Sequence, residues 1–192
     1  MMNLKLTRRG VLAGSGVGLM VLAGCGGRDS LDSTGGVDAN VERAVATMYD
    51  RLPFTRDIAS RAAGMLVMPG IVKGGFIVGG AYGEGALRVR GDNYRQSAAY
   101  YSFGAASVGY QIGLQKTAHT LFFMTDGALD KFRNSQNWEV GADAEVTVLD
   151  TGVKADLNTT IAQQPVLAVI YSQQGLMAGA SLEGAKYTRI LK

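Results

Sequence analysis

Residues 75–89 read GFIVGGAYGEGALRV, and the spacing of glycine in this stretch indicates the fold. Side chains of a β-strand alternate between its two faces. The even-numbered positions include Phe76, Tyr82 and Glu84, whereas the odd-numbered positions carry almost no side chain. The odd-numbered positions are Gly75, Ile77, Gly79, Ala81, Gly83 and Gly85. One face of the predicted strand is therefore nearly bare.

Glycine recurs in the same way further along the chain, which contains 27 glycines. A second nearly bare face follows at Ala105, Ser107, Gly109, Gln111 and Gly113. Glycine inside a strand marks a bend or the close approach of another group, and sheets that curl into barrels use such kinks. Two interpretations remain open: tight packing within a strongly curved sheet, or a groove left open for a lipid chain or another ligand.

The remaining chain divides into short segments of strand or helix character. Apolar residues at helical spacing predict helices over Val37–Leu52, Thr55–Ala63 and Asp126–Ser135. Strands are predicted at Met65–Met68, Gly75–Arg90, Ala99–Gln115, Thr120–Met124, Val140–Leu149, Val166–Ser172, Leu176–Leu182 and Ala185–Leu191. The expected fold class is α+β, with a curved, mostly antiparallel Gly-rich or barrel-like sheet packed with an N-terminal helix and a central helix.

The N-terminal helix has an apolar stripe that includes Val41, Met48 and Leu52. We expect this stripe to pack on the core of the domain. A helix lying on a membrane surface is the alternative, although its polar face is mixed in sign rather than rich in Lys and Arg.

The first 24 residues have the composition of a secretory signal. Lys5, Arg8 and Arg9 precede the uncharged run 10–24, which is too short for the ~20 residues that a membrane-spanning helix needs. This pattern is typical of a cleaved signal peptide. The stretch 7–12 also resembles a twin-arginine export signal, with Val11 where that motif usually has Phe.

Residues 22–25, Leu-Ala-Gly-Cys, resemble the lipobox of bacterial lipoproteins. That resemblance implies acylation of Cys25, and Gly26 after it favours the outer membrane, with the domain on the periplasmic face. An ordinary signal followed by a stray Cys is the alternative. The Gly- and Ser-rich residues 26–36 read as a flexible tether of at most ~40 Å, so residues 25–36 would be anchor and tether, and 37–192 one domain.

The charge balance argues against nucleic acid as a partner. Three of the 19 Lys and Arg residues lie in the signal, which leaves 16 against 16 Asp and Glu in the rest of the chain. Nucleic-acid-binding domains usually carry a basic excess. A local basic patch remains compatible with this balance.

An ordered series of motifs resembles the SYLF domain family. The residues that carry the resemblance are 63–69, 73–76, 79–85, 107–113, 123–125, 128–132, 141–144, 171–172, 175–179 and 181–184. The resemblance extends over Val37–Leu191 and implies lipid binding, because eukaryotic members bind phosphoinositides through an N-terminal amphipathic helix and basic residues. Bacterial members are mostly exported proteins.

A phosphate ligand needs cations, and the sequence offers Lys73, Arg88, Arg90, Lys116 and Lys131 as candidate lipid-binding residues. Lys73 stands in the Lys-Gly-Gly-Phe context that matches the family, and each of the five is otherwise a solvated surface charge. The expected function is non-catalytic binding of an envelope phospholipid. The alternative is a structural or protein-interaction lipoprotein with an envelope protein as its partner.

Sequence signals for catalysis or cofactor binding are weak. We expect no cofactor and no metal, because His119 and Cys25 are the single His and Cys and no ligand cluster has metal-binding spacing. Glu84 and Glu183 stand beside glycines as a conceivable acid/base pair. Asp143 and Glu145 share a strand face but offer too few oxygens for calcium.

Overall fold

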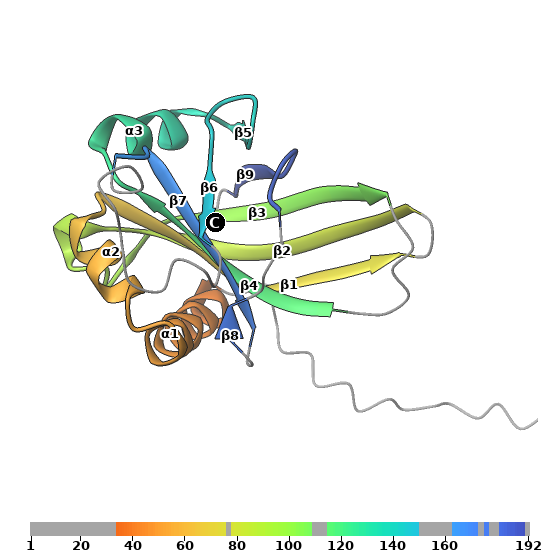
Figure 1. The fold of residues 1–192 in the computed structure, drawn as a ribbon. Coiled ribbons are helices and arrows are strands. Elements are labelled where there is room, and N and C mark those ends of the chain that lie inside the picture. The colour runs from red at the N-terminus through yellow and green to blue at the C-terminus, as the bar shows by residue number, and fades with distance from the viewer. Residues whose placement is uncertain are drawn as a thin grey trace, which may run out of the picture.

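The computed structural model describes residues 34–75, 78–108, 115–149, 163–172, 175–176 and 181–190 (Figure 1). The expected signal peptide, Cys25 and the first part of the expected tether lie outside these ranges. The helices are α1 (Thr34–Arg51), α2 (Thr55–Arg61), the 3-10 turn η1 (Arg90–Asp92) and α3 (Asp126–Asn134). The strands are β1 (Gly64–Gly75), β2 (Val78–Val89), β3 (Ser97–Val108), β4 (Gln115–Phe123), β5 (Asn137–Glu139), β6 (Thr147–Leu149), β7 (Val166–Ser172), β8 (Gly175–Leu176) and β9 (Lys186–Ile190).

All of these strands belong to one sheet. Its order is β5-β9-β3-β2-β1-β4-β7-β6, and β8 pairs with β7. Each pairing is antiparallel except that of β6 with β7. The sheet curls into a half-barrel with α1 packed on it, so the predicted α+β class with a curved, mostly antiparallel sheet is confirmed.

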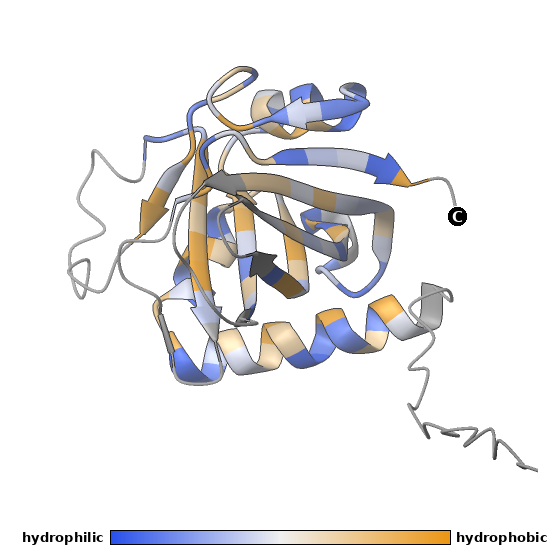
Figure 2. Ribbon diagram, turned by 90° about the vertical axis from the view of Figure 1, so that its right-hand side faces the viewer, coloured by the Kyte–Doolittle hydropathy of each residue, from blue (hydrophilic) through white to orange (hydrophobic). Residues whose placement is uncertain are grey.

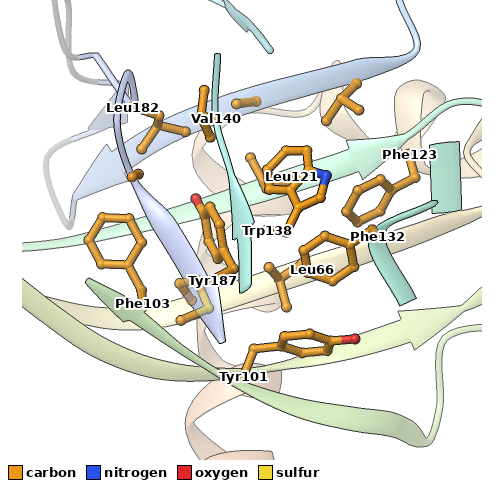
Figure 3. Packing of buried hydrophobic residues seen from close by; sticks show 14 of the residues in the cluster. Leu66, Tyr101, Phe103, Leu121, Phe123, Phe132, Trp138, Val140, Leu182 and Tyr187 are labelled. Atoms are coloured by element: carbon orange, nitrogen blue, oxygen red, sulfur yellow. The ribbon is translucent and has the colours of Figure 1, made fainter. Parts of the chain in front are cut away.

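The inner face of the sheet is the face that carries the larger aromatic cluster (Figure 3). The Phe132 ring of α3 lies 4.6 Å from that of Tyr101 and 4.7 Å from that of Phe123, measured between centroids. Trp138 and Tyr187 close the cluster, with centroids 5.7 Å apart. Offset and tilted aromatic pairs of this kind stabilise a core beyond their area of burial, and here they fasten α3, β5 and β9 across the curl of the sheet.

The outer face is the face on which α1 lies (Figure 2). Val41 and Met48 of α1 are fully buried against side chains of the central strands, among them Val67 and Phe122. The prediction of a helix that packs its apolar stripe on the core is therefore confirmed. The helix begins at Thr34, within the predicted tether, and the first of its residues described as buried is Val37.

A bulge in β1 explains part of the glycine pattern. Between Val67 and Val72 the register of β1 shifts against β2, and this interval contains Pro69, a residue that strands accept at bulges. A Cβ on Gly85 would lie 2.1 Å from the carbonyl oxygen of Val67, and a Cβ on Gly83 would lie 2.9 Å from that of Gly70. These glycines let β1 approach β2, so tight packing in a curved sheet is the correct interpretation there.

The predicted strand Val140–Leu149 is wrong, and residues 181–182 of the predicted strand Leu176–Leu182 lie in no strand. Residues 140–149 do not form a continuous strand, because Gly141 adopts a φ of 91° and turns the chain. The turn is closed by the amide of Gly141 donating to the carbonyl of Ala144 and by the carboxylate of Asp143 accepting from the amide of Glu139. Strand structure returns only in β6. In the described ranges, no helix combines the length and the apolar character needed to cross a membrane.

Candidate functional site

The five predicted lipid-binding cations do not form one cluster. Lys73 and Lys116 lie on the neighbouring strands β1 and β4. They are at the end of the sheet where β1 stops and β4 starts, on the right in Figure 1. Arg88 and Arg90 are at the other end of β2, and Lys131 is on α3. The structure therefore separates the predicted set into one pair and three scattered residues.

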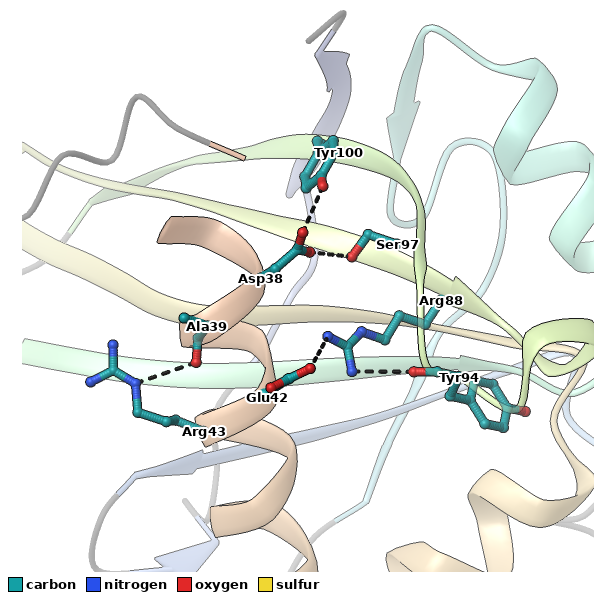
Figure 4. A network of polar contacts seen from close by, with 8 residues as sticks. All are labelled: Asp38, Ala39, Glu42, Arg43, Arg88, Tyr94, Ser97 and Tyr100. Carbon is teal, nitrogen blue, oxygen red and sulfur yellow. Dashed lines mark hydrogen bonds and ion pairs between the residues drawn. The ribbon is translucent and has the colours of Figure 1, made fainter. Parts of the chain in front are cut away.

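Arg88 holds α1 on the sheet and is not a surface charge (Figure 4). Only 5% of the residue is exposed. Its guanidinium forms an ion pair with Glu42 of α1 at 3.7 Å and donates to the carbonyl of Tyr94 at 3.2 Å. Its Nε has no hydrogen-bond partner. With α1 in place a lipid phosphate cannot reach this guanidinium, so Arg88 serves the fold.

Arg90 and Lys131 are exposed at separate places on the body of the domain. Arg90 begins η1, and its amide donates to the carbonyl of Ala63. Lys131 lies in the last turn of α3, where a positive charge favours the helix dipole. The predicted cation nearest to Arg90 in sequence is Arg88, which is buried and paired with Glu42 of α1.

Lys116 belongs to a row of residues that crosses four strands on the outer face. The register pairs Lys116 with Val72, Val72 with Tyr82, and Tyr82 with Gly104, and paired residues of antiparallel strands share a face. Val72 is 42% exposed and Tyr82 55% exposed. These are the large hydrophobic side chains that remain exposed within the described ranges. A cation thus stands at the end of an exposed apolar pair.

Lys73 lies on the opposite face of the same end of the sheet, because it follows Val72 in the strand. Its register partners are Ala81 and Gln115, and Ala81 in turn pairs with Ala105. Neither Lys73 nor Lys116 forms an ion pair with a carboxylate of the described residues. The end of the sheet therefore carries one ammonium group on each face.

We call this end the sheet tip, defined as residues 71–75, 78–83, 104–108 and 115–117. The carboxylate closest to it in sequence is Glu84, whose Oε1 accepts a hydrogen bond of 2.8 Å from the Tyr82 hydroxyl. Partial burial, followed by this hydrogen bond, raises the pKa of Tyr82. Because the tip as defined contains Lys73 and Lys116 and no Asp or Glu, its formal charge is positive.

The residues considered for chemistry are placed in structural roles. His119 is buried and its Nε2 lies 2.7 Å from the Tyr187 hydroxyl, and burial lowers the pKa of His119 to about 3. Glu84 is on β2, whereas Glu183 is exposed in the turn before β9. Across the described ranges, no group of three or more His, Cys, Asp or Glu residues could hold a metal ion.

Sequence reasoning missed the apolar pair at the tip. The alternation of the strand places Tyr82 on its populated face, but no local pattern shows whether another element covers that side chain. A usable signal did exist: Tyr82 is the one bulky residue within the run Gly79 to Gly85. An aromatic side chain among small neighbours has little beside it to cover its ring.

Residues 104–189 match the family model described as Ysc84: Las17-binding protein actin regulator. The matched part begins in β3 at the sheet tip and ends in β9, so it includes Lys116, His119 and α3. No curated protein matches the chain.

Proposed function

Because residues 104–189 belong to the Ysc84 (SYLF) domain family, we propose that the protein binds phospholipid at a membrane surface and catalyses no reaction. The observation that carries the proposal is that Lys73 and Lys116 lie at the same end of the sheet, on opposite faces of the neighbouring strands β1 and β4. Both ammonium groups are without a carboxylate partner in the described ranges. Charge-assisted hydrogen bonds from such groups bind phosphate oxygens.

A local cationic site fits the composition better than attraction through net charge. The chain after residue 24 carries equal numbers of basic and acidic residues. Each Lys near an anionic membrane contributes about 1 kcal/mol to binding, and this attraction fades within a Debye length. Two lysines at one end of the domain therefore favour weak binding to anionic lipid in a defined orientation.

Sedimentation with vesicles tests this function. Every helix and strand of the described fold lies after residue 33, so residues 26–192 retain the whole folded part without the acyl chains. We expect this fragment to pellet with vesicles that contain phosphatidylglycerol and to remain in solution without them. Absence from the pellet with every envelope phospholipid would refute the proposal.

We further propose that the chain is a lipoprotein of the bacterial outer membrane, exported by residues 1–24 and held by acylated Cys25 on the periplasmic face. The support is the sequence Leu-Ala-Gly-Cys at residues 22–25 and the uncharged run before it. Cells grown with labelled palmitate should label the wild-type chain and leave Cys25→Ala unlabelled. A wild-type chain without label would contradict the anchor.

A protein-binding role is the second candidate, favoured by the description of the matched family as a Las17-binding protein. In this case the domain would contact an envelope protein and the anchor alone would supply the membrane. Cross-linking in cells separates the two functions. One stoichiometric protein partner, with no lipid retained in native mass spectrometry of residues 26–192, would favour this second candidate.

A further inference from the structure

We propose that the sheet tip is the part of the domain that enters the membrane, with Val72 and Tyr82 among the upper acyl chains and the long side chains of Lys116 and Lys73 reaching back to the phosphate level. This inference rests on the proposed lipid binding. It adds the surface that makes the contact, the side chains that enter the lipid and the orientation of the domain, with the tip toward the membrane and α3 away from it (Figure 1).

The first argument is the position of the exposed apolar pair. Val72 and Tyr82 are cross-strand partners and remain 42% and 55% exposed. Elsewhere on the outer face, α1 covers the large apolar side chains of the central strands. The pair lies outside the residues that pack with α1, and both side chains remain exposed in the part of the chain that the structure describes.

The second argument is the shape of the surroundings. The next row of the outer face toward the end of the strands is Gly74, Gly80 and Ala106. A Cβ built on Gly80 would meet nothing closer than the carbonyl of Ala105 at 3.8 Å. Because their outward neighbours are this small, Val72 and Tyr82 project from the sheet and can reach into a fluid partner.

The third argument is that the cations beside the apolar pair fit an anionic lipid surface as the binding partner. Lys116 stands beside Val72 in the same row, and its Cε lies 3.2 Å from the position of a Cβ on Gly70, so its stem crosses β1 at the bulge. Lys73 is on the other face. Cations at the border of an apolar patch match anionic headgroups above acyl chains, and tyrosine is enriched at that boundary. Lys186, in the same row, is already paired with Glu139 at 3.1 Å.

The strand edges limit how deeply the tip can enter. β9 pairs with β3 only over Tyr100–Gly104, and β7 pairs with β4 only from Ala118 onward. Within the described ranges, residues 105–108 and 115–117 therefore have no strand neighbour on their outer side. Unpaired backbone groups are costly in hydrocarbon, so the tip stays at the level of the headgroups and the upper acyl chains.

Site-specific fluorescence tests the orientation. Residues 26–192 contain no Cys, so Val72→Cys or Tyr82→Cys can each carry an environment-sensitive dye. With phosphatidylglycerol vesicles we expect a blue shift at both positions and quenching by spin labels on the acyl chains. Dyes at Arg61→Cys on α2 and Asp130→Cys on α3, both exposed positions, should report water throughout.

Partition measurements separate the apolar and the charged contributions. The double variant Val72→Ser with Tyr82→Ser should bind phosphatidylglycerol vesicles about tenfold more weakly. Lys116→Gln should bind anionic vesicles about fivefold more weakly. Arg133→Gln removes an exposed cation from α3 and should have no effect. Thermal unfolding of each variant should match the wild type.

Two outcomes overturn the inference. If the wild-type fragment binds vesicles but the dyes at positions 72 and 82 stay in water, or those on α2 and α3 enter lipid, the orientation is wrong while lipid binding stands. If the wild-type fragment binds no vesicle, the orientation and the proposed function both fail.

Discussion

Gly85 is the residue at which the curvature of the sheet is most directly encoded. A methyl group there would lie 2.1 Å from the carbonyl oxygen of Val67 and 2.6 Å from the sulfur of Met68, so β1 and β2 would have to separate. We expect Gly85→Ala to lower the free energy of unfolding by about 3 kcal/mol. Gly104→Ala is the matched control, because its Cβ would meet nothing within 4 Å. Urea denaturation measures both, and equal losses would contradict this role of Gly85.

His119 is expected to make stability depend on pH. Burial lowers the pKa of His119 from 6.5 to about 3, so on acidification the unfolded chain takes up the proton first. The stabilisation is complete above the unfolded pKa and is lost as the pH falls from about 6.5 towards 3, at up to about 1.4 kcal/mol per pH unit.

Urea denaturation between pH about 7 and 5 tests this prediction. In that window the wild type should lose stability more steeply than His119→Gln. The comparison isolates His119, because the two proteins differ only at this residue. Parallel curves would show that the environment of His119 does not disfavour its protonated form.

Sequence could predict individual residues only where the pattern itself carries the geometry. The glycines of 75–89 predicted a bent sheet, because a missing Cβ has a direct steric consequence. The sequence could not predict that Arg88 is buried, because the two groups that bind its guanidinium, the Glu42 carboxylate and the Tyr94 carbonyl, come from other parts of the chain. A cation looks the same in sequence whether it faces solvent or a distant carboxylate.

Helix α1 is held on the sheet by polar contacts as well as by its apolar stripe. The Asp38 carboxylate accepts hydrogen bonds from the hydroxyls of Ser97 and Tyr100 on β3 (Figure 4). We expect Asp38→Ala to destabilise the fold by about 2 kcal/mol, because two hydroxyls lose a charged acceptor. Hydrogen exchange should accelerate first in the N-terminal half of α1.

Asp50→Ala is the control for this prediction, since it removes the same residue type from the same helix. Its carboxylate is 79% exposed and pairs with the exposed, adjacent Arg51, so the loss should be close to zero. Equal effects of the two substitutions would mean that Asp38 does not fasten α1.

At the level of elements, periodicity predicted the helices better than the strands. α1, α2 and α3 lie within two or three residues of their predicted ends, because helical periodicity is local. β1 runs on to Gly75, beyond the predicted end at Met68, since a bulge accommodates Pro69. Helix ends need only neighbours in sequence, whereas strand ends depend on partner strands.

At the scale of the whole molecule, the sheet has a covered part and an exposed part. The part under α1 and around the aromatic cluster is closed on both faces, while the tip is left uncovered in the described ranges. The fold class followed from glycine spacing and the helix patterns. The tip did not, because Val72, Tyr82 and Lys116 meet only through the pairing of three strands.

If the chain is anchored by a lipid, the tip can bind the membrane weakly and still orient the domain. A tether raises the effective concentration of a second binding site to about millimolar, so tip contacts too weak to hold a free domain can still orient an anchored one. We therefore predict that the full chain with Val72→Ser, Tyr82→Ser and Lys116→Gln fractionates with membranes as the wild type does. The anchorless form consists of residues 26–192 exported behind a cleavable signal. We expect it to remain partly on membranes when the tip is intact, and to be released when the tip carries the three substitutions. Fractionation of the four proteins measures this: the anchored wild type, the anchored variant, and both anchorless forms. Release of the anchored variant would show that acylation of Cys25 does not hold the chain, and equal retention of the two anchorless forms would show that the tip contributes nothing to membrane contact.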